Sequence, residues 1–266
     1  MRKSRVKAKL ARNEPVLVTT IHFNDPSIFE MASLMGFDAL WLDAEHHAHS
    51  AETISAQLRA SRVGTSDVVV RPAKGEFMRM GRILEAGAAG IMYPRCDSAD
   101  EAREVVRWAK FAPLGERGID SANPDNPYCA VPLERYIKEA NDETFIVVQV
   151  EQQHAVDRVE EIAAVKGVDV VMLGPGDLGI LSGVPGQFDH PTIDKAKEKI
   201  AAATKKAGIH WGCPCLSVQD IPRHLEMGAR FICLSADFTI LKRGFEQMQA
   251  ECIPLGFTFN NQMAAF

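Results

Sequence analysis

Ionisable side chains stand just after four of the apolar runs in this 266-residue sequence. In chain order these side chains are Asp43, Glu45, His46 and His47, then Arg71, then Glu151, then Asp177. If the runs are parallel strands of one sheet, their carboxyl ends lie at the same edge, and the charged groups meet there. The sequence therefore predicts one polar site assembled from distant parts of the chain.

Two of these carboxylates suit a metal ion. Glu151 follows the run "VVQV" and Asp177 follows "VVMLGPG", so adjacent strands would deliver two oxygen ligands to one place. Such a pair favours a hard divalent cation that keeps open positions for water and substrate, which indicates magnesium or manganese. The alternative is that each carboxylate only caps the helix that follows it.

A second group could move protons and stabilise negative charge. Arg71 at a strand end could orient a carboxylate or stabilise an oxyanion, or it could form a structural salt bridge. His46 titrates near neutrality, and Asp43 could fix its tautomer. The neighbouring histidines are His47 and His49, and His22 follows the first run. We expect one catalytic histidine and two bystanders in the window 46–49, although several close histidines could also bind a transition metal.

The segment Gly174-Pro175-Gly176-Asp177 precedes a predicted helix. Its glycines leave backbone N–H groups uncovered, and such groups can hold a carboxylate or a phosphate. Ordinary turn chemistry is the alternative explanation.

The elements that position these residues follow a repeating order of short β-branched runs and longer helical segments. The expected strands are Val16–Ile21, Ala39–Leu42, Val68–Val70, Gly90–Tyr93, Phe145–Val150, Val168–Leu173, Ile209–Gly212 and Phe231–Leu234. Each is followed by a plausible helix, such as Phe77–Glu85, which ends before Gly87. Eight such units predict an α/β fold of the (β/α)8, or TIM barrel, class, in a single domain spanning residues 1–266.

One segment lacks any periodicity. Residues 112–132 are rich in Pro, Gly, Asn and Asp, and loops of that length in a compact domain are usually binding loops or lids. We expect this loop to follow the fourth strand and to cover the active-site face.

Composition restricts the partners. The net charge of −5, with basic residues spread along the chain, gives no footprint for nucleic acid or an anionic membrane. No apolar run reaches the roughly 18 residues that span a bilayer, and the basic segment Met1–Arg12 is not followed by the apolar stretch of a signal peptide. We therefore expect a cytoplasmic protein whose partners are small molecules.

With these residues in place, the sequence resembles the HpcH/HpaI family of class II pyruvate aldolases, within the phosphoenolpyruvate-binding barrel superfamily. The similarity runs from about Val16 to Gly244. Its motifs are "GFDALWLDAEH", "VVVRP", "ILEAGAAGIMYPRCDSADEAREVV", "PLGERG", "VVQVE", "GVDVVMLGPGDL" and "LKRG".

The resemblance implies a reversible retro-aldol cleavage of a 4-hydroxy-2-oxo acid to an aldehyde and pyruvate, or a hydroxypyruvate-like 2-oxo acid. It implies that Glu151 and Asp177 bind the metal (magnesium, manganese or cobalt), which the keto and carboxylate oxygens of pyruvate also bind. The backbone N–H groups of Gly176 and Asp177 then hold the carboxylate, and Gln149 lies near the substrate.

For the chemical step, the resemblance implies that Arg71 stabilises the enolate oxygen. His46, paired with Asp43, moves the proton of the 4-hydroxyl group. Metal and arginine together would counter the enolate charge, so no Schiff-base lysine is required. The resemblance also implies a homo-oligomer, a hexamer with exchanged terminal helices.

Three positions depart from the family pattern and leave the aldehyde open: Glu85, Asp120 and His47. An acyl-CoA thioester lyase of the citrate lyase beta or malyl-CoA lyase type is the alternative enzyme. Such an enzyme would need a basic and aromatic surface that binds the nucleotide part of CoA. The loop 112–132 contains only Arg117 as a positive charge. A non-catalytic barrel protein is a third possibility, which the retention of four charged strand ends argues against.

Overall fold

The computed structural model describes residues 2–265 and contains a closed barrel of parallel strands, each paired with the next and the last with the first. The strands are β1 (Val16–Ile21), β2 (Ala39–Asp43), β3 (Asp67–Arg71), β4 (Gly90–Tyr93), β5 (Phe145–Val150), β6 (Val170–Leu173), β7 (His210–Cys215) and β8 (Phe231–Ala236). The predicted single-domain (β/α)8 barrel is confirmed.

The expected strand bounds hold closely. β1, β4 and β5 have the predicted limits, while β7 and β8 continue to Cys215 and Ala236, beyond the apolar residues that marked them. β6 begins at Val170 rather than Val168, because the N–H of Val168 donates to the carbonyl of Val165 in a turn. In β5 every residue is buried, so the apolar run in the sequence has the same limits as the hydrogen-bonded strand.

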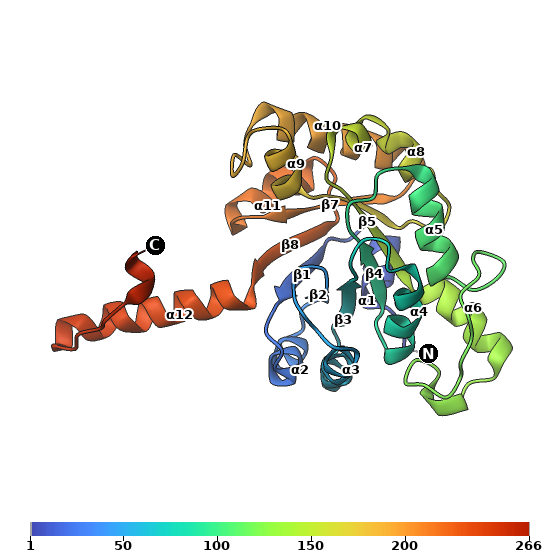
Figure 1. Ribbon diagram of the computed structural model, residues 1–266, viewed down its shortest axis with the longest axis horizontal. Coiled ribbons are helices and arrows are strands. Elements are labelled where there is room, and N and C mark those ends of the chain that lie inside the picture. Colours follow the sequence, from blue (N-terminus) through green and yellow to red (C-terminus); the bar gives the residue numbers. More distant parts are fainter. Residues whose placement is uncertain (1, 266) are drawn as a thin grey trace.

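Helices surround the barrel (Figure 1). They are α1 (Arg5–Ala11), α2 (Pro26–Leu34), α3 (Ala51–Ala60), α4 (Phe77–Ala86), α5 (Ala99–Ala109), α6 (Leu133–Glu143), α7 (Gln153–Asp157), α8 (Val159–Ala163), α9 (Pro175–Leu181), α10 (Pro191–Ala207), α11 (Ile221–Glu226) and α12 (Asp237–Cys252). Short 3-10 turns lie at Ser61–Val63, Pro127–Cys129, Val218–Asp220, Ile253–Leu255 and Gln262–Ala265. Across residues 2–265, no helix has the length and apolar character needed to cross a membrane.

Sequence cues fix the ends of several helices. The Ser98 side chain accepts a hydrogen bond from the N–H of Glu101 at the start of α5, as an N-cap does. Gly87 ends α4 with φ of 113°, a conformation that favours glycine. These helices pack their apolar faces on the outside of the strands, and a separate apolar cluster fills the barrel interior.

The N-terminal segment forms α1, an element that the sequence analysis did not predict. Val6 and Leu10, one helical turn apart, are buried in the apolar cluster inside the barrel. The Ser4 hydroxyl donates to Oδ2 of Asp67 at 2.7 Å, and Nζ of Lys7 lies 2.6 Å from Oδ1 of Asp169. Helix α1 therefore covers the amino-terminal ends of the strands.

The long loop 112–132 lies at this same end, and the prediction that it covers the active-site face is wrong. It follows helix α5, which runs back from the carboxyl end of β4 to the amino-terminal ends of the strands. Nη1 of Arg62 donates to the carbonyl of Pro124 at 3.0 Å, and Nη1 of Arg59 contacts the Tyr128 hydroxyl at 3.1 Å. Both arginines lie just before β3, at the foot of the barrel.

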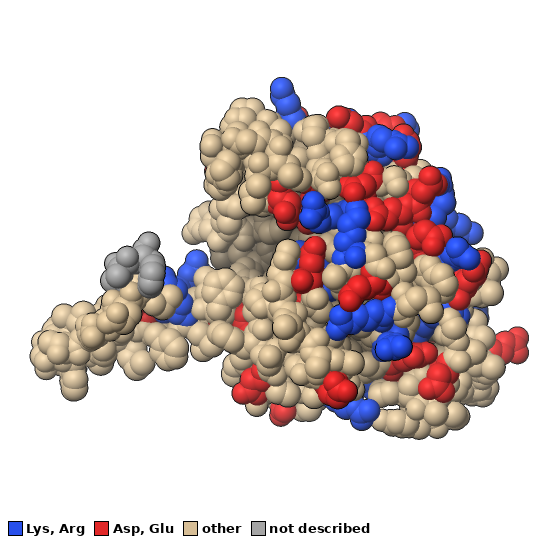
Figure 2. Space-filling model, in the orientation of Figure 1, with Lys and Arg blue, Asp and Glu red and all other residues tan. Residues whose placement is uncertain are grey.

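At the opposite side, α12 projects from the barrel as a long arm (Figure 1). Its surface is largely uncharged in the view of Figure 2. Large apolar side chains on the arm are exposed: Phe238, Ile240, Leu241, Phe245 and Met248. Within α12, only Asp237 is buried.

Candidate active site

The centre of the predicted site is a buried ion pair between neighbouring strands. Asp43 and Arg71 are register partners at the carboxyl ends of β2 and β3. Nε of Arg71 donates to Oδ1 of Asp43 at 2.9 Å, and Nη2 donates to Oδ2 at 2.8 Å. This two-point contact fixes the plane of the guanidinium and lowers the pKa of Asp43, although burial of Asp43 opposes that effect.

Two further contacts hold the arginine in place. Nη1 of Arg71 lies 3.3 Å from Oε1 of Gln149, a buried side chain on β5. The guanidinium carbon lies 4.6 Å from the centre of the Trp41 ring, within the range of a cation–π contact. Arg71 is therefore fixed across the mouth of the barrel, from β3 towards β5.

Glu151 directly follows β5 and is 2% exposed. Burial, and then the nearby charge of Asp177, raises the pKa of Glu151 to about 7. Its Oε2 accepts a hydrogen bond from the N–H of Arg95 at 3.2 Å. A buried carboxylate with a second carboxylate beside it is costly unless a cation is close, and Arg71 supplies only part of that charge.

A glycine makes room for this carboxylate. A Cβ atom at Gly174 would lie 2.3 Å from Oε1 of Glu151, too close for any side chain. Gly174 and Asp177 flank the start of α9, where a Cβ at Gly176 would meet nothing within 4 Å. The strand-to-helix turn thus packs against Glu151 at one glycine and leaves open space at the other.

Glu45 is a site residue to which the sequence analysis gave no role. Its side chain is only 11% exposed, and Oε2 lies 3.2 Å from Nε of Arg71. Burial raises the pKa of Glu45, while Arg71 opposes the rise. The signal was present in the motif "DAEHH", but sequence alone does not show which of its polar side chains turns inward.

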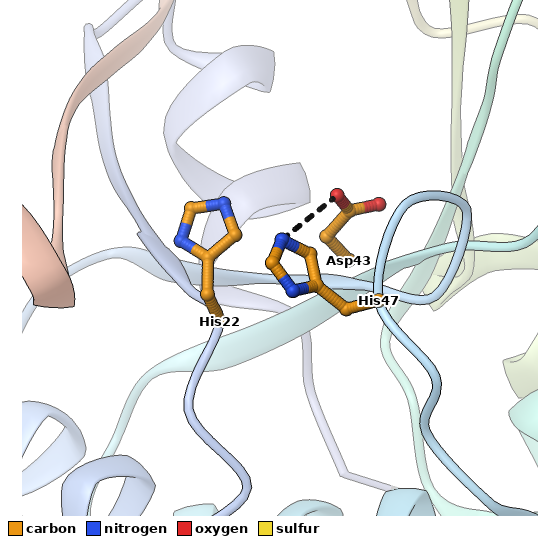
Figure 3. A group of neighbouring side chains, drawn as sticks. All are labelled: His22, Asp43 and His47. Atoms are coloured by element: carbon orange, nitrogen blue, oxygen red, sulfur yellow. Dashed lines mark ion pairs between the residues drawn. The ribbon is translucent and has the colours of Figure 1, made fainter.

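The histidines are arranged differently from the predicted pairing of His46 with Asp43. His46 is 61% exposed, and its Nε2 lies 3.5 Å from Oε2 of Glu45. It is His47 whose Nε2 faces Asp43, with Oδ2 at 4.0 Å (Figure 3). Arg71 binds both oxygens of Asp43, and in this arrangement His47 and not His46 is the histidine next to them.

Two other histidines lie close by. The His22 ring centre is 4.5 Å from that of His47, and the His49 ring is 6.2 Å from it. Burial, followed by the charge of a neighbouring histidine, lowers the pKa of both His47 and His49. His47 and His49 are therefore expected to be neutral at pH 7.

The acidic residues fit a hard divalent cation. Glu151 and Asp177 offer carboxylate oxygens at adjacent strand ends, and the charge of Glu45 adds to theirs. Beside Gly176 there is space for the waters or substrate oxygens that such an ion keeps. In the view of Figure 2 the surface is hollowed between α11 and the base of α12, on the side of the molecule where the strands end.

Comparison with known proteins shows the family of the chain. The model of the HpcH/HpaI aldolase/citrate lyase family matches residues 21–243. The chain is 32% identical to the 4-hydroxy-2-oxo-heptane-1,7-dioate aldolase of Shigella sonnei, over 92% of the chain and 93% of that protein. It is 33% identical to the 5-keto-4-deoxy-D-glucarate aldolase of Klebsiella pneumoniae, over 92% of the chain and 95% of that protein.

A solved structure agrees. An HpcH/HpaI aldolase from Desulfitobacterium hafniense is similar with a TM-score of 0.87 and 31% identity, covering 96% of this chain and 98% of the other. The likeness therefore covers the whole barrel and not one motif.

Proposed function

Because the chain belongs to the HpcH/HpaI aldolase/citrate lyase family, we propose that it is a carbon–carbon lyase that cleaves 4-hydroxy-2-oxo acids to pyruvate and an aldehyde. The observation that carries the proposal at this site is the buried carboxylate of Glu151 with Asp177 close by; burial, and then the charge of Asp177, raises the pKa of Glu151 to about 7. An aldolase of this class needs positive charge next to the enolate oxygen that forms when the carbon–carbon bond breaks.

The 2-oxo acid end of the substrate is placed at Glu151 and Asp177. These two residues would hold a divalent cation, magnesium, manganese or cobalt, which supplies positive charge to the keto and carboxylate oxygens. The N–H groups of Gly176 and Asp177 would bind the carboxylate, and the open space at Gly176 supports that arrangement.

Arg71 is assigned to the developing enolate oxygen. Its guanidinium is fixed by Asp43 and Gln149 before any substrate arrives, so it need not reorganise during the reaction. Preorganised charge of this kind commonly contributes about 3–4 kcal/mol to the stabilisation of a transition state. Asp43 thus serves here as the positioning residue of Arg71.

His46 is assigned to the 4-hydroxyl proton, with Glu45 rather than Asp43 as its carboxylate neighbour. We expect His46→Asn to lower kcat by roughly 10²- to 10⁴-fold, the usual contribution of a positioned acid or base. The measurement is kcat against pH for His46→Asn and His47→Asn side by side. A larger loss in His47→Asn would move the proton-transfer role to His47.

The proposed reaction is tested by pyruvate release from a panel of 4-hydroxy-2-oxo acids. Purified protein is treated with a chelator, divided, and given magnesium, manganese, cobalt or nothing. We expect cleavage only with metal, and loss of metal-dependent turnover in Glu151→Gln, which is close in size but carries no charge. Circular dichroism of the variant controls for folding. Turnover of malyl-CoA with no cleavage of any panel member would reject the aldolase and favour the thioester lyase.

We also propose that the enzyme is a homo-oligomer, a hexamer in which α12 of one copy packs on another. The exposed apolar side chains of α12 support this, because a projecting arm of Phe, Ile and Leu side chains is costly in water. The arm joins the barrel at its amino-terminal end, where Asp237 accepts from the backbone N–H groups of His22 and Phe23.

A further inference from the structure

A second cluster of metal-ligating side chains lies beside the proposed aldolase site and uses neither Glu151 nor Asp177. It consists of His22 after β1, Asp43 at the end of β2 and His47 in the following loop. One ligand atom from each of the three lies within 4.8 Å of the others. Figure 3 shows the two imidazole rings side by side, with the Asp43 carboxylate next to His47.

His22 is held as metal-binding histidines usually are. Its Nδ1 lies 3.2 Å from Oδ1 of Asp237, a carboxylate that is 4% exposed. Oδ2 of Asp237 accepts from the backbone N–H groups of His22 and Phe23, at 2.9 and 2.8 Å, so the acid itself is fixed. When Nδ1 donates to Asp237, Nε2 carries the lone pair. A carboxylate behind a ligating histidine sets its tautomer and ring orientation.

A further buried imidazole, that of His49, lies next to His47. His49 is 6% exposed, and neither of its ring nitrogens has a hydrogen-bond partner in the described part of the chain. Buried polar atoms are nearly always paired, so both ring nitrogens of His49 remain available to a water molecule or an ion. Its ring centre lies 6.2 Å from that of His47.

We propose that His22, Asp43 and His47 form a binding site for a transition-metal ion of the zinc, cobalt and nickel class, separate from the cation site at Glu151 and Asp177. Two imidazoles and one carboxylate are the donors that such ions prefer, whereas magnesium prefers oxygen ligands throughout. Asp43 can bind the ion and keep its contact with Arg71, because a carboxylate has about four lone-pair positions.

The experiment titrates Co²⁺ into the full chain in excess Mg²⁺, so that the oxygen-ligand site is occupied. Bound cobalt is counted by equilibrium dialysis, and its visible absorption reports nitrogen ligation. We expect one cobalt per chain that magnesium does not displace, with intense visible bands. His22→Gln and His47→Gln should each weaken its binding by roughly tenfold or more, and Asp237→Asn by roughly 10- to 100-fold.

Two controls separate this site from other binding. His154→Gln removes an exposed histidine elsewhere, and Glu151→Gln removes the charge of the proposed aldolase ligand; both should keep the cobalt bands. The site is rejected if magnesium abolishes the bands, if Glu151→Gln removes them, or if His22→Gln and His47→Gln bind cobalt like wild type. Because magnesium-supported turnover is a separate readout, failure here leaves the aldolase proposal standing.

Discussion

At the scale of single residues, the site depends on a glycine as much as on its charged groups. Oε1 of Glu151 lies 2.3 Å from the position that a Cβ at Gly174 would take. We expect Gly174→Ala to push the carboxylate aside and to lower Mg²⁺ or Mn²⁺ affinity by roughly tenfold or more, the scale seen when a ligand's support is lost. Metal titration of the chelator-treated protein measures this.

Gly176→Ala is the matched control, since a Cβ there meets no atom within 4 Å. Its metal affinity should stay close to wild type, even though the added methyl group occupies space assigned to substrate. Equal metal affinity in the Gly174 and Gly176 variants would show that Glu151 does not need its present position to bind the ion.

The residues of the site were largely predictable, but their partners were not. The sequence placed Asp43, Arg71 and Glu151 at strand ends because an apolar run stops where a charge begins. It could not show that Arg71 occupies both oxygens of Asp43, because that contact depends on strand register and side-chain rotamers. For the same reason the contact of His46 with Glu45 could not be predicted.

At the scale of elements, α1 makes stability depend on pH through Asp67. Oδ2 of this buried carboxylate accepts from the Ser4 hydroxyl and the N–H of Val6, and burial raises the pKa of Asp67 to about 6. The unfolded chain releases this proton near pH 4. Between these values the folded state holds a proton that the unfolded state has lost, so raising the pH through this window destabilises the fold.

We expect the wild type to lose about 3 kcal/mol relative to Asp67→Asn as pH rises from 4 to above 6, since about two pKa units separate the states. Thermal or urea unfolding of both proteins at fixed concentration across this range measures the difference. A constant difference between them would mean that Asp67 has the same pKa in both states.

The predicted elements are marked by residues within them or next to them, whereas helix α1, which was not predicted, is held by distant parts of the chain. β5 is a continuous apolar run, and Gly87 and Ser98 mark helix ends by local chemistry. Helix α1 has only two large apolar side chains, Val6 and Leu10, among basic residues and alanines. Its burial depends on acids at the starts of distant strands, such as Asp67 and Asp169. Contacts of that range leave no local pattern.

At the scale of the whole molecule, assembly is expected to depend on α12. Phe245 is 59% exposed, and in an oligomer it would be covered. We expect Phe245→Asp to reduce the mass in solution from about six times 29.2 kDa towards that of smaller assemblies, because a buried charge opposes the contact. Light scattering after size-exclusion chromatography measures the mass.

Val63→Asp is the control, because Val63 is equally exposed at 59% but lies outside α12. It should leave the mass unchanged. A wild-type chain that runs as a monomer at all concentrations would reject the oligomer, whereas a hexamer insensitive to Phe245→Asp would place the contact elsewhere on the molecule.

The stacking of Arg71 on Trp41 has an optical consequence. Of the three tryptophans in the chain, Trp41 is the one whose ring lies 4.6 Å from the proposed oxyanion-binding group. Trp108 donates to Glu104 on α5, and Trp211 donates to the carbonyl of Met227 at the far end of the barrel. Indole emission is sensitive to nearby charge, so an anionic ligand bound at Arg71 would change the fluorescence of Trp41 even if the arginine stays in place. We therefore expect the fluorescence of Trp41 to report occupancy of the site without a label or a coupled assay.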